Sequence, residues 1–88
     1  MTTKEYEELI KFLKLYCNEY IFRLPIKEEI KELDYYYGVT EYEWKSPSEY
    51  EDITIKIREN LNTDKLTFIL ECHDEDLIIQ KTINNTYF

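Results

Sequence analysis

The sequence contains one glycine, one histidine and two cysteines among its 88 residues. A phosphate-binding loop needs several glycines, so no glycine-rich cradle can form. A tetrahedral zinc site needs four ligands, which two distant cysteines and one histidine do not supply unless a carboxylate joins them. No apolar run approaches the ~18–20 residues that cross a bilayer, and the residues after Met1 are polar. We therefore expect a cytoplasmic protein without a signal peptide or a membrane-spanning segment.

The one histidine, His73, stands between Cys72 and Asp74, which raises the possibility of a nucleophile, a base and an orienting group. In a strand, however, Cys72 and His73 point to opposite faces, whereas a working thiolate–imidazole pair needs heavy atoms about 3 Å apart. The run from His73 to Asp76 offers oxygens to Ca²⁺ but lacks a spaced loop with a central glycine. We expect no catalytic residue, no metal site, no cofactor and no enzyme activity.

The two cysteines, Cys17 and Cys72, occupy positions where the surrounding pattern wants an apolar residue. Free cysteine often behaves as a small hydrophobic residue, so we expect two buried thiols in a reducing compartment, with one buried disulfide as the alternative. The length of 88 residues predicts one compact domain over 1–88, large enough to fold without a disulfide.

The N-terminal part of the chain has the apolar spacing of helices. Residues 2–22 predict an amphipathic helix that begins with a capping box formed by Thr2 and Glu5. Pro25 ends this segment and can open a second, shorter helix that Gly38 ends. The apolar stripe of the first helix comprises Tyr6, Leu9, Ile10, Leu13, Tyr16, Cys17, Tyr20 and Ile21, and that of the second Ile26, Ile30, Leu33 and Tyr37.

After Gly38 the apolar period changes to two, which is typical of strands. Strands are predicted at 39–45, 53–58, 66–72 and 77–83, although helical spacing is an alternative for 49–61. The links are short and rich in turn formers, which favours an antiparallel meander. The predicted fold is therefore α+β and two-layered, with two N-terminal helices followed by three to four strands. The expected core contains Leu9, Leu13, Ile55, Ile57, Phe68, Leu70 and Ile79.

Nineteen acidic residues against eleven basic ones give a net charge of −8, and the acids are unevenly placed. Residues 39–52 hold five acids and one lysine, and residues 71–88 hold four acids and one lysine. Phosphates and anionic lipids repel such a chain, so we expect no direct binding to nucleic acid or to a membrane. A basic protein partner fits this charge best.

The first acidic stretch is interleaved with aromatic side chains, and three consecutive tyrosines at 35–37 cannot all face one core. Tyrosine and tryptophan are enriched at the centres of interfaces. The alternative is that these acids solvate an edge strand and that the tyrosines are half-buried packing. The predicted partner-binding residues are Tyr35, Tyr36, Glu41, Tyr42, Glu43, Trp44, Glu49, Tyr50, Glu51 and Asp52, with Asp74, Glu75 and Asp76 as a second contact.

Alternate carboxylates such as Glu41 and Glu43 lie roughly 6–7 Å apart along a strand, comparable with two base steps of DNA. We therefore expect an acidic inhibitor that blocks the basic nucleic-acid-binding surface of a partner such as a nuclease. In size, charge and aromatic content the chain resembles the small acidic proteins that phages use against restriction or CRISPR nucleases. Immunity proteins against nuclease toxins are similar in this respect. The alternative is a general interaction module, a homodimer or accessory subunit that binds through a tyrosine-rich face.

Overall fold

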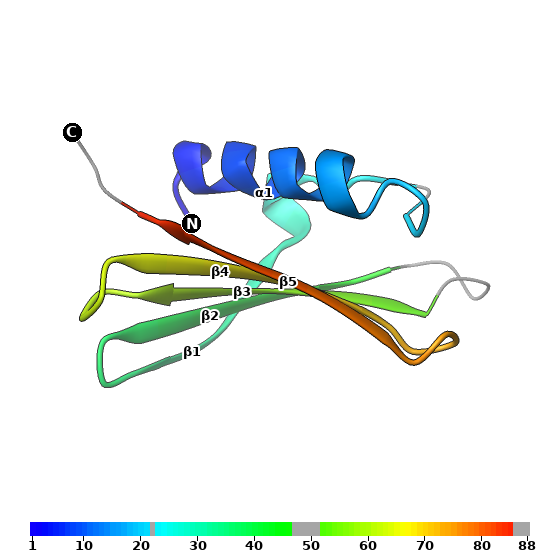
Figure 1. Ribbon diagram of the computed structural model, residues 1–88. Helices are drawn as coiled ribbons and strands as arrows, with labels where there is room; N and C mark the ends of the chain where they lie inside the picture. The colour runs from blue at the N-terminus through cyan, green and yellow to red at the C-terminus, as the bar shows by residue number, and fades with distance from the viewer. Residues whose placement is uncertain (22, 47–51, 86–88) are drawn as a thin grey trace.

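The computed structural model describes residues 1–21, 23–46 and 52–85, and it has an α+β fold in two layers. One α-helix precedes a meander of five antiparallel strands that follow one another across the sheet in chain order, within these described residues (Figure 1). The elements are α1 (Thr3–Tyr16), the 3-10 turn η1 (Lys27–Glu29), β1 (Lys31–Tyr36), β2 (Val39–Lys45), β3 (Ile53–Asn60), β4 (Lys65–Cys72) and β5 (Leu77–Asn84).

Helix α1 begins as the sequence predicts. The backbone N–H of Glu5 donates to Oγ1 of Thr2 at 3.1 Å, and the N–H of Thr2 donates to Oε1 of Glu5 at 2.7 Å, which completes the capping box. The helix ends at Tyr16 and not at residue 22 as predicted. Fourteen helical residues span about 21 Å, whereas twenty-one would span about 31 Å and overrun strands of eight residues, which span about 26 Å.

The predicted second helix is wrong. Residues 27–29 form a single 3-10 turn, and residues 31–36 form β1, which pairs with β2. A two-residue turn closes this hairpin, because Tyr37 and Gly38 both have positive φ angles, 49° and 80°. Two consecutive positive φ angles are the mark of the type I′ turn that favours tight hairpins. Gly38 therefore lies in a hairpin turn and not at the end of a helix. With β1 the described sheet has five strands, where three to four were predicted.

The alternating pattern predicted the other strands correctly. Residues 39–45 form β2 with Thr40, Tyr42 and Trp44 buried on one face, and residues 53–60 form β3 and not a helix. The register places Trp44 opposite Ile55, and Ile55 opposite Leu70. These buried side chains therefore line up across neighbouring strands and form a continuous apolar face.

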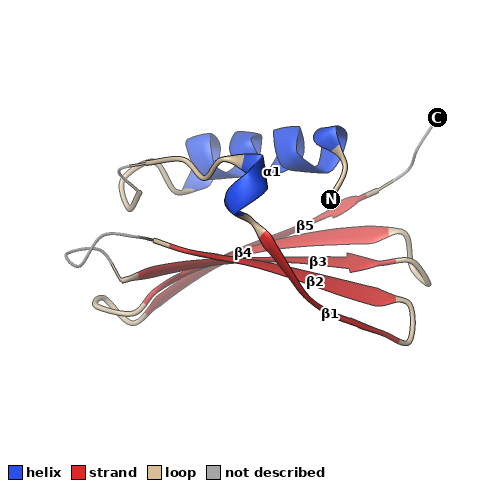
Figure 2. Ribbon diagram, turned by 180° about the vertical axis from the view of Figure 1, so that it is seen from behind, coloured by secondary structure: helices blue, strands red, loops and turns tan. Residues whose placement is uncertain are grey.

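Helix α1 lies across that apolar face, and no other element covers the opposite face within the described residues (Figures 1 and 2). We call the uncovered side the open face. Six of the seven predicted core residues are buried, whereas Ile79 on β5 is only partly buried. Phe12, which is not among the predicted core residues, is 3% exposed and stacks on Phe68 with ring centroids 5.5 Å apart. The complete core comprises Leu9, Phe12, Leu13, Cys17, Tyr42, Trp44, Ile53, Ile55, Ile57, Leu66, Phe68, Leu70 and Cys72.

Cys17 and Cys72 are both free thiols and both buried, as predicted. Burial raises the pKa of the Cys17 thiol to about 11, because the thiolate would lose its hydration there. No helix among the described residues has the length and apolar character needed to span a membrane.

Candidate protein-binding surface

Four exposed carboxylates gather at one end of the sheet. Asp52 directly precedes β3, and Asp74, Glu75 and Asp76 form most of the turn between β4 and β5. The two segments are joined, because the backbone N–H of His73 donates to the carbonyl oxygen of Asp52 at 3.0 Å. We call Asp52, Asp74, Glu75 and Asp76 the acidic end. It unites residues from both acidic stretches of the sequence.

The acidic end is not neutralised by neighbouring cations. None of its four carboxylates forms an ion pair within the described residues. The backbone of the turn is fixed by a hydrogen bond from the N–H of Asp76 to the carbonyl oxygen of His73 at 3.3 Å. The predicted contacts Glu49, Tyr50 and Glu51 lie between Ser46 and Asp52 but outside the described residues.

Glu41 and Glu43 lie on the open face, as the alternating pattern predicts, but cations accompany them there. Oε1 of Glu41 accepts hydrogen bonds from Nε of Arg58 at 3.0 Å and from the hydroxyl of Tyr36 at 3.1 Å. Oε1 of Glu43 lies 3.8 Å from Nζ of Lys45. The pair therefore belongs to a mixed-charge surface and does not present two free negative charges in a row.

The same surface continues onto β3 and β4. Nζ of Lys56 forms an ion pair with Oε1 of Glu71 at 2.9 Å, and Nε2 of His73 lies 3.7 Å from the other oxygen of Glu71. The hydrogen bond to Glu71 is the main reason why the pKa of Lys56 is raised, and the nearby Glu43 and Glu41 carboxylates add to it. The ring of His73 also contacts Thr54, with 3.2 Å between Nε2 and Oγ1. Cations on the same strand or on a neighbouring strand therefore accompany the carboxylates of Glu41, Glu43 and Glu71 on the open face.

Tyr42 and Trp44 do not belong to the surface. Both point toward α1 and are buried, with 9% and 4% exposure, so their proposed role as interface anchors is corrected. The reason is the period of two in β2, which places them opposite to Glu41 and Glu43. Trp44 instead packs in the core.

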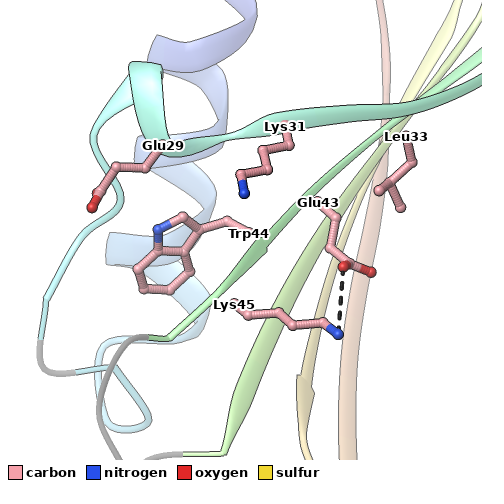
Figure 3. Close-up of a pocket in the computed structure, with 6 residues that line it drawn as sticks. All are labelled: Glu29, Lys31, Leu33, Glu43, Trp44 and Lys45. Carbon is pink, nitrogen blue, oxygen red and sulfur yellow. Dashed lines mark ion pairs between the residues drawn. The ribbon is translucent and has the colours of Figure 1, made fainter.

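One edge of Trp44 borders an open pocket of about 410 Å³ between β1 and β2. Figure 3 shows the indole ring beside Glu29 on one side of the pocket and the Glu43–Lys45 ion pair on the other. Both signs of charge are present in the lining, which comprises Glu29, Lys31, Leu33, Glu43, Trp44 and Lys45. Such a balanced lining does not indicate a ligand of either charge.

Tyr35, Tyr36 and Tyr37 form a second exposed cluster, which we call the tyrosine turn. These residues are 63%, 43% and 91% exposed. The rings of Tyr36 and Tyr37 meet edge to face with centroids 6.3 Å apart. Tyr37 is missing from the predicted contacts, because its position in the sequence was assigned to the apolar face of a helix. In the sequence, the feature that marks Tyr37 is its position directly before Gly38, the one glycine.

The acidic end and the tyrosine turn lie at opposite ends of β2. Tyr37 and Gly38 precede the strand, whereas Ser46 follows it, and seven strand residues span about 23 Å. The predicted contact region from Tyr35 to Asp52 is therefore not one continuous surface. It divides into an aromatic surface at one end of the sheet and an acidic surface at the other.

Among residues 1–21, 23–46 and 52–85, no group of three or more histidine, cysteine, aspartate or glutamate side chains is arranged to hold a metal ion. Comparison of the chain with protein-family models, with curated proteins and with solved structures finds no match. The acidic end and the tyrosine turn are therefore the two candidate binding surfaces of this molecule.

Proposed function

We propose that this protein is a small inhibitor that binds the basic nucleic-acid-binding surface of another protein, such as a nuclease, through its acidic end. The supporting observation is a set of four exposed carboxylates that form no ion pair with any other described residue, brought together by the Asp52–His73 backbone hydrogen bond. In this role the protein competes with nucleic acid and carries out no chemistry, so it needs no cofactor. Phage proteins directed against restriction or CRISPR nucleases, and immunity proteins against nuclease toxins, act on partners of this kind.

The charge distribution supports this direction of binding. A net charge of −8 draws a basic partner toward the molecule at long range, and clustered charges at one end orient the encounter. Glu41, Glu43 and Glu71 contribute less, because Arg58, Lys45 and Lys56 already accompany them. The proposed contact therefore centres on Asp52 and the turn between β4 and β5, which are among the predicted contacts, and not on the carboxylates of β2.

The test compares two variants with equal changes in net charge. The first replaces Asp52, Asp74 and Glu75 with lysine and keeps Asp76, whose φ of 51° disfavours most other side chains. The control replaces three other exposed acids with lysine. These are Glu7 on α1, Glu28 on η1 and Glu32 on β1. Each variant and the unmodified protein are used to capture partners from a lysate of the native host, and the captured protein is then challenged with DNA or guide RNA.

We expect the acidic-end variant to lose the captured protein and the control variant to keep it. DNA or guide RNA should displace the unmodified protein from its partner, and rising salt should slow association steeply over a Debye length of ~8–10 Å. If both variants lost the captured protein equally, binding would depend only on net charge and not on the acidic end. Full binding by the acidic-end variant would refute the proposal.

A second candidate function is an interaction module that binds through the tyrosine turn. The 91% exposure of Tyr37 favours it, because large aromatic side chains are typical interface anchors. Binding of this kind depends weakly on salt, and the loss of an anchor acts mainly on the dissociation rate. Replacement of Tyr35 and Tyr37 with alanine should then abolish capture, whereas reversal of the acidic end should leave it unchanged.

A further inference from the structure

The two edge strands of the sheet differ in how well they are protected against pairing with another strand. The edge strand β1 carries the exposed charges of Lys31 and Glu32, and its register shifts between positions 32 and 34, which marks a bulge or irregularity. Charges and bulges are the usual means of blocking an edge. The other edge strand, β5, pairs with β4 without a register shift over all eight residues and carries one charge, that of Lys81. The unprotected edge of this sheet is therefore β5.

The backbone of β5 shows which groups face outward. The N–H of Asn85 donates to the carbonyl oxygen of Asp64 on the β4 side at 2.7 Å. Because backbone groups alternate along an antiparallel strand, the odd-numbered residues of β5 bond to β4 and the even-numbered residues point away. The N–H and C=O groups of Ile78, Gln80 and Thr82 therefore form a row of outward-facing donors and acceptors.

We propose that β5 pairs in antiparallel fashion with β5 of a second copy of this chain, centred on Gln80, so that the two five-stranded sheets become one continuous sheet. In this register, Gln80 of each copy exchanges two backbone hydrogen bonds with Gln80 of the other. The twofold axis is perpendicular to the sheet, and the two α1 helices lie on the same face. Such a contact is isologous, as in most homodimers.

Most side chains of β5 fit one another in this register, although Ile79 lies opposite Lys81 of the other copy. Leu77 of one copy lies opposite Ile83 of the other, and Ile78 lies opposite Thr82, so apolar and uncharged groups meet at both ends of the paired segment. The neighbouring register, centred on Lys81, places two lysines directly opposite each other and is disfavoured. Of these two registers, the sequence of β5 therefore favours the one centred on Gln80.

Charge placement at the shared edge does not oppose a second copy, despite the net charge of −8. Antiparallel pairing around Gln80 puts Asp76 of one copy opposite Asn84 of the other, and Glu75 beside Asn85. Each acidic turn therefore meets an uncharged segment, and the two acidic turns lie at opposite ends of the shared edge. Asp52 and Asp74 of the acidic end lie outside the paired segment, so this inference goes beyond the proposed function and does not depend on it.

Helix α1 supplies apolar surface along the same edge. Leu15 and Tyr16 are 68% and 47% exposed, and Nζ of Lys81 lies 5.1 Å from the centre of the Tyr16 ring. Leu15, Tyr16 and Ile83 line a small pocket of about 60 Å³ between α1 and β5. A stable interface buries about 800 Å² per partner, roughly a seventh of the 5925 Å² surface of this chain, so strand pairing needs such flanking contacts.

The test uses two variants of opposite charge at the centre of the twofold axis. Wild-type protein and the variants Gln80→Glu and Gln80→Lys are measured by sedimentation equilibrium at about 1 to 100 µM. We expect a dimer for the wild type. Each variant alone should dissociate more readily, because its two like charges face each other. An equal mixture of the two variants should form a mixed dimer about tenfold tighter than either variant with itself.

Matched controls keep the test specific. Asn18→Glu and Asn18→Lys make the same charge changes at an exposed position just after α1 and should leave dimerisation unchanged. Gln80→Pro removes an outward N–H without touching the bonds to β4, so it should weaken the dimer by about tenfold or more while the far-ultraviolet circular dichroism stays the same. A monomeric wild type throughout this range, or a mixture that associates no better than its components, would overturn the proposal.

Discussion

Arg58 and Glu41 lie directly opposite each other on β3 and β2, and Nε of Arg58 donates to Oε1 of Glu41 at 3.0 Å. This contact changes the role expected of Glu41, which in the sequence is one of several closely spaced acids with no evident cation partner. A carboxylate whose charge is met by a guanidinium at this distance attracts a basic partner less than an unpaired one. The register of the β2–β3 pair, which the sequence alone does not reveal, thus decides which acids are available for binding.

The first prediction concerns Glu41→Gln. The pair is partly exposed, with side-chain exposures of 48% and 25%, so the free energy of unfolding should fall by no more than about 1 kcal/mol. The association rate with a basic partner should change less than in Asp74→Asn, which removes an unpaired charge. Urea unfolding and stopped-flow association measure the two effects. A larger loss of association for Glu41→Gln than for Asp74→Asn would show that β2 is the contact surface after all.

The second prediction compares two leucines of the same helix. Leu13 is 0% exposed, so Leu13→Ala should lower the free energy of unfolding by about 2–5 kcal/mol through lost burial and a cavity. Leu15 is 68% exposed, and Leu15→Ala should change the free energy of unfolding by less than about 0.5 kcal/mol. Urea unfolding of both variants at equal, low protein concentration provides the measurement. Similar losses for both variants would contradict the orientation of α1.

The alternating apolar pattern of the sequence predicted β2, β3, β4 and β5. In a sheet that is covered on one face, a period of two determines which side chains of each strand are buried. Thr40, Tyr42 and Trp44 had to share the buried side once α1 was assigned to cover it. The same rule could have removed Tyr42 and Trp44 from the predicted contacts. What it could not supply is the cross-strand neighbour of each exposed acid.

The hairpin of β1 and β2 was missed for a local reason. Ile26, Ile30, Leu33 and Tyr37 fit helical spacing, and a glycine after them resembles a helix end. The actual turn places a tyrosine at a positive φ, where asparagine, aspartate or glycine is usual, so the familiar hairpin signal is absent. Tertiary pairing with β2 outweighed the helical pattern of a segment that also contains three residues with high strand propensity, Tyr35, Tyr36 and Tyr37.

The third prediction concerns how the stability of the protein depends on pH below about 4.5. Nη1 and Nη2 of Arg23 donate to the two carboxylate oxygens of Glu29, at 2.9 and 2.7 Å, and the N–H of Ile26 adds a third bond at 3.0 Å. The hydrogen bond from Arg23 is the largest cause that lowers the pKa of Glu29 from 4.5 to about 2. Because the folded-state pKa is below the unfolded value, this stabilisation is complete above pH 4.5 and is lost as the pH falls toward 2.

Arg23→Gln should therefore raise the pKa of Glu29 toward its usual value and flatten the dependence of stability on pH between about 4.5 and 2. A carboxyl ¹³C titration by nuclear magnetic resonance measures the pKa directly. Lys27→Gln, a charge change on the same 3-10 turn, is the control and should leave the pKa of Glu29 lowered. An unchanged value in Arg23→Gln would show that Arg23 is not the cause.

The fourth prediction concerns Gly38. Its φ of 80° disfavours every residue with a side chain, and a Cβ placed there would lie 2.8 Å from Nδ2 of Asn62. That nitrogen donates to the carbonyl oxygen of Tyr37 at 2.6 Å, so the clash would disturb the contact between the two hairpins. Gly38→Ala should lower the free energy of unfolding by at least about 1–2 kcal/mol. Urea unfolding checks this, and no loss in Gly38→Ala would show that the turn adopts another type.

The last prediction concerns Tyr37, where stability and function separate. Its φ of 49° is unfavourable for an aromatic side chain, and its 91% exposure means that little packing is lost on its removal. Tyr37→Asn should therefore raise the free energy of unfolding by about 0.5–1 kcal/mol, since asparagine tolerates this conformation better. If the acidic end is the contact, the more stable variant should bind the partner as well as wild type. If the tyrosine turn is the contact, the same variant should be more stable and yet dissociate faster, a combination that unfolding cannot produce. Thermal unfolding combined with surface plasmon resonance against the captured partner measures both quantities on one sample.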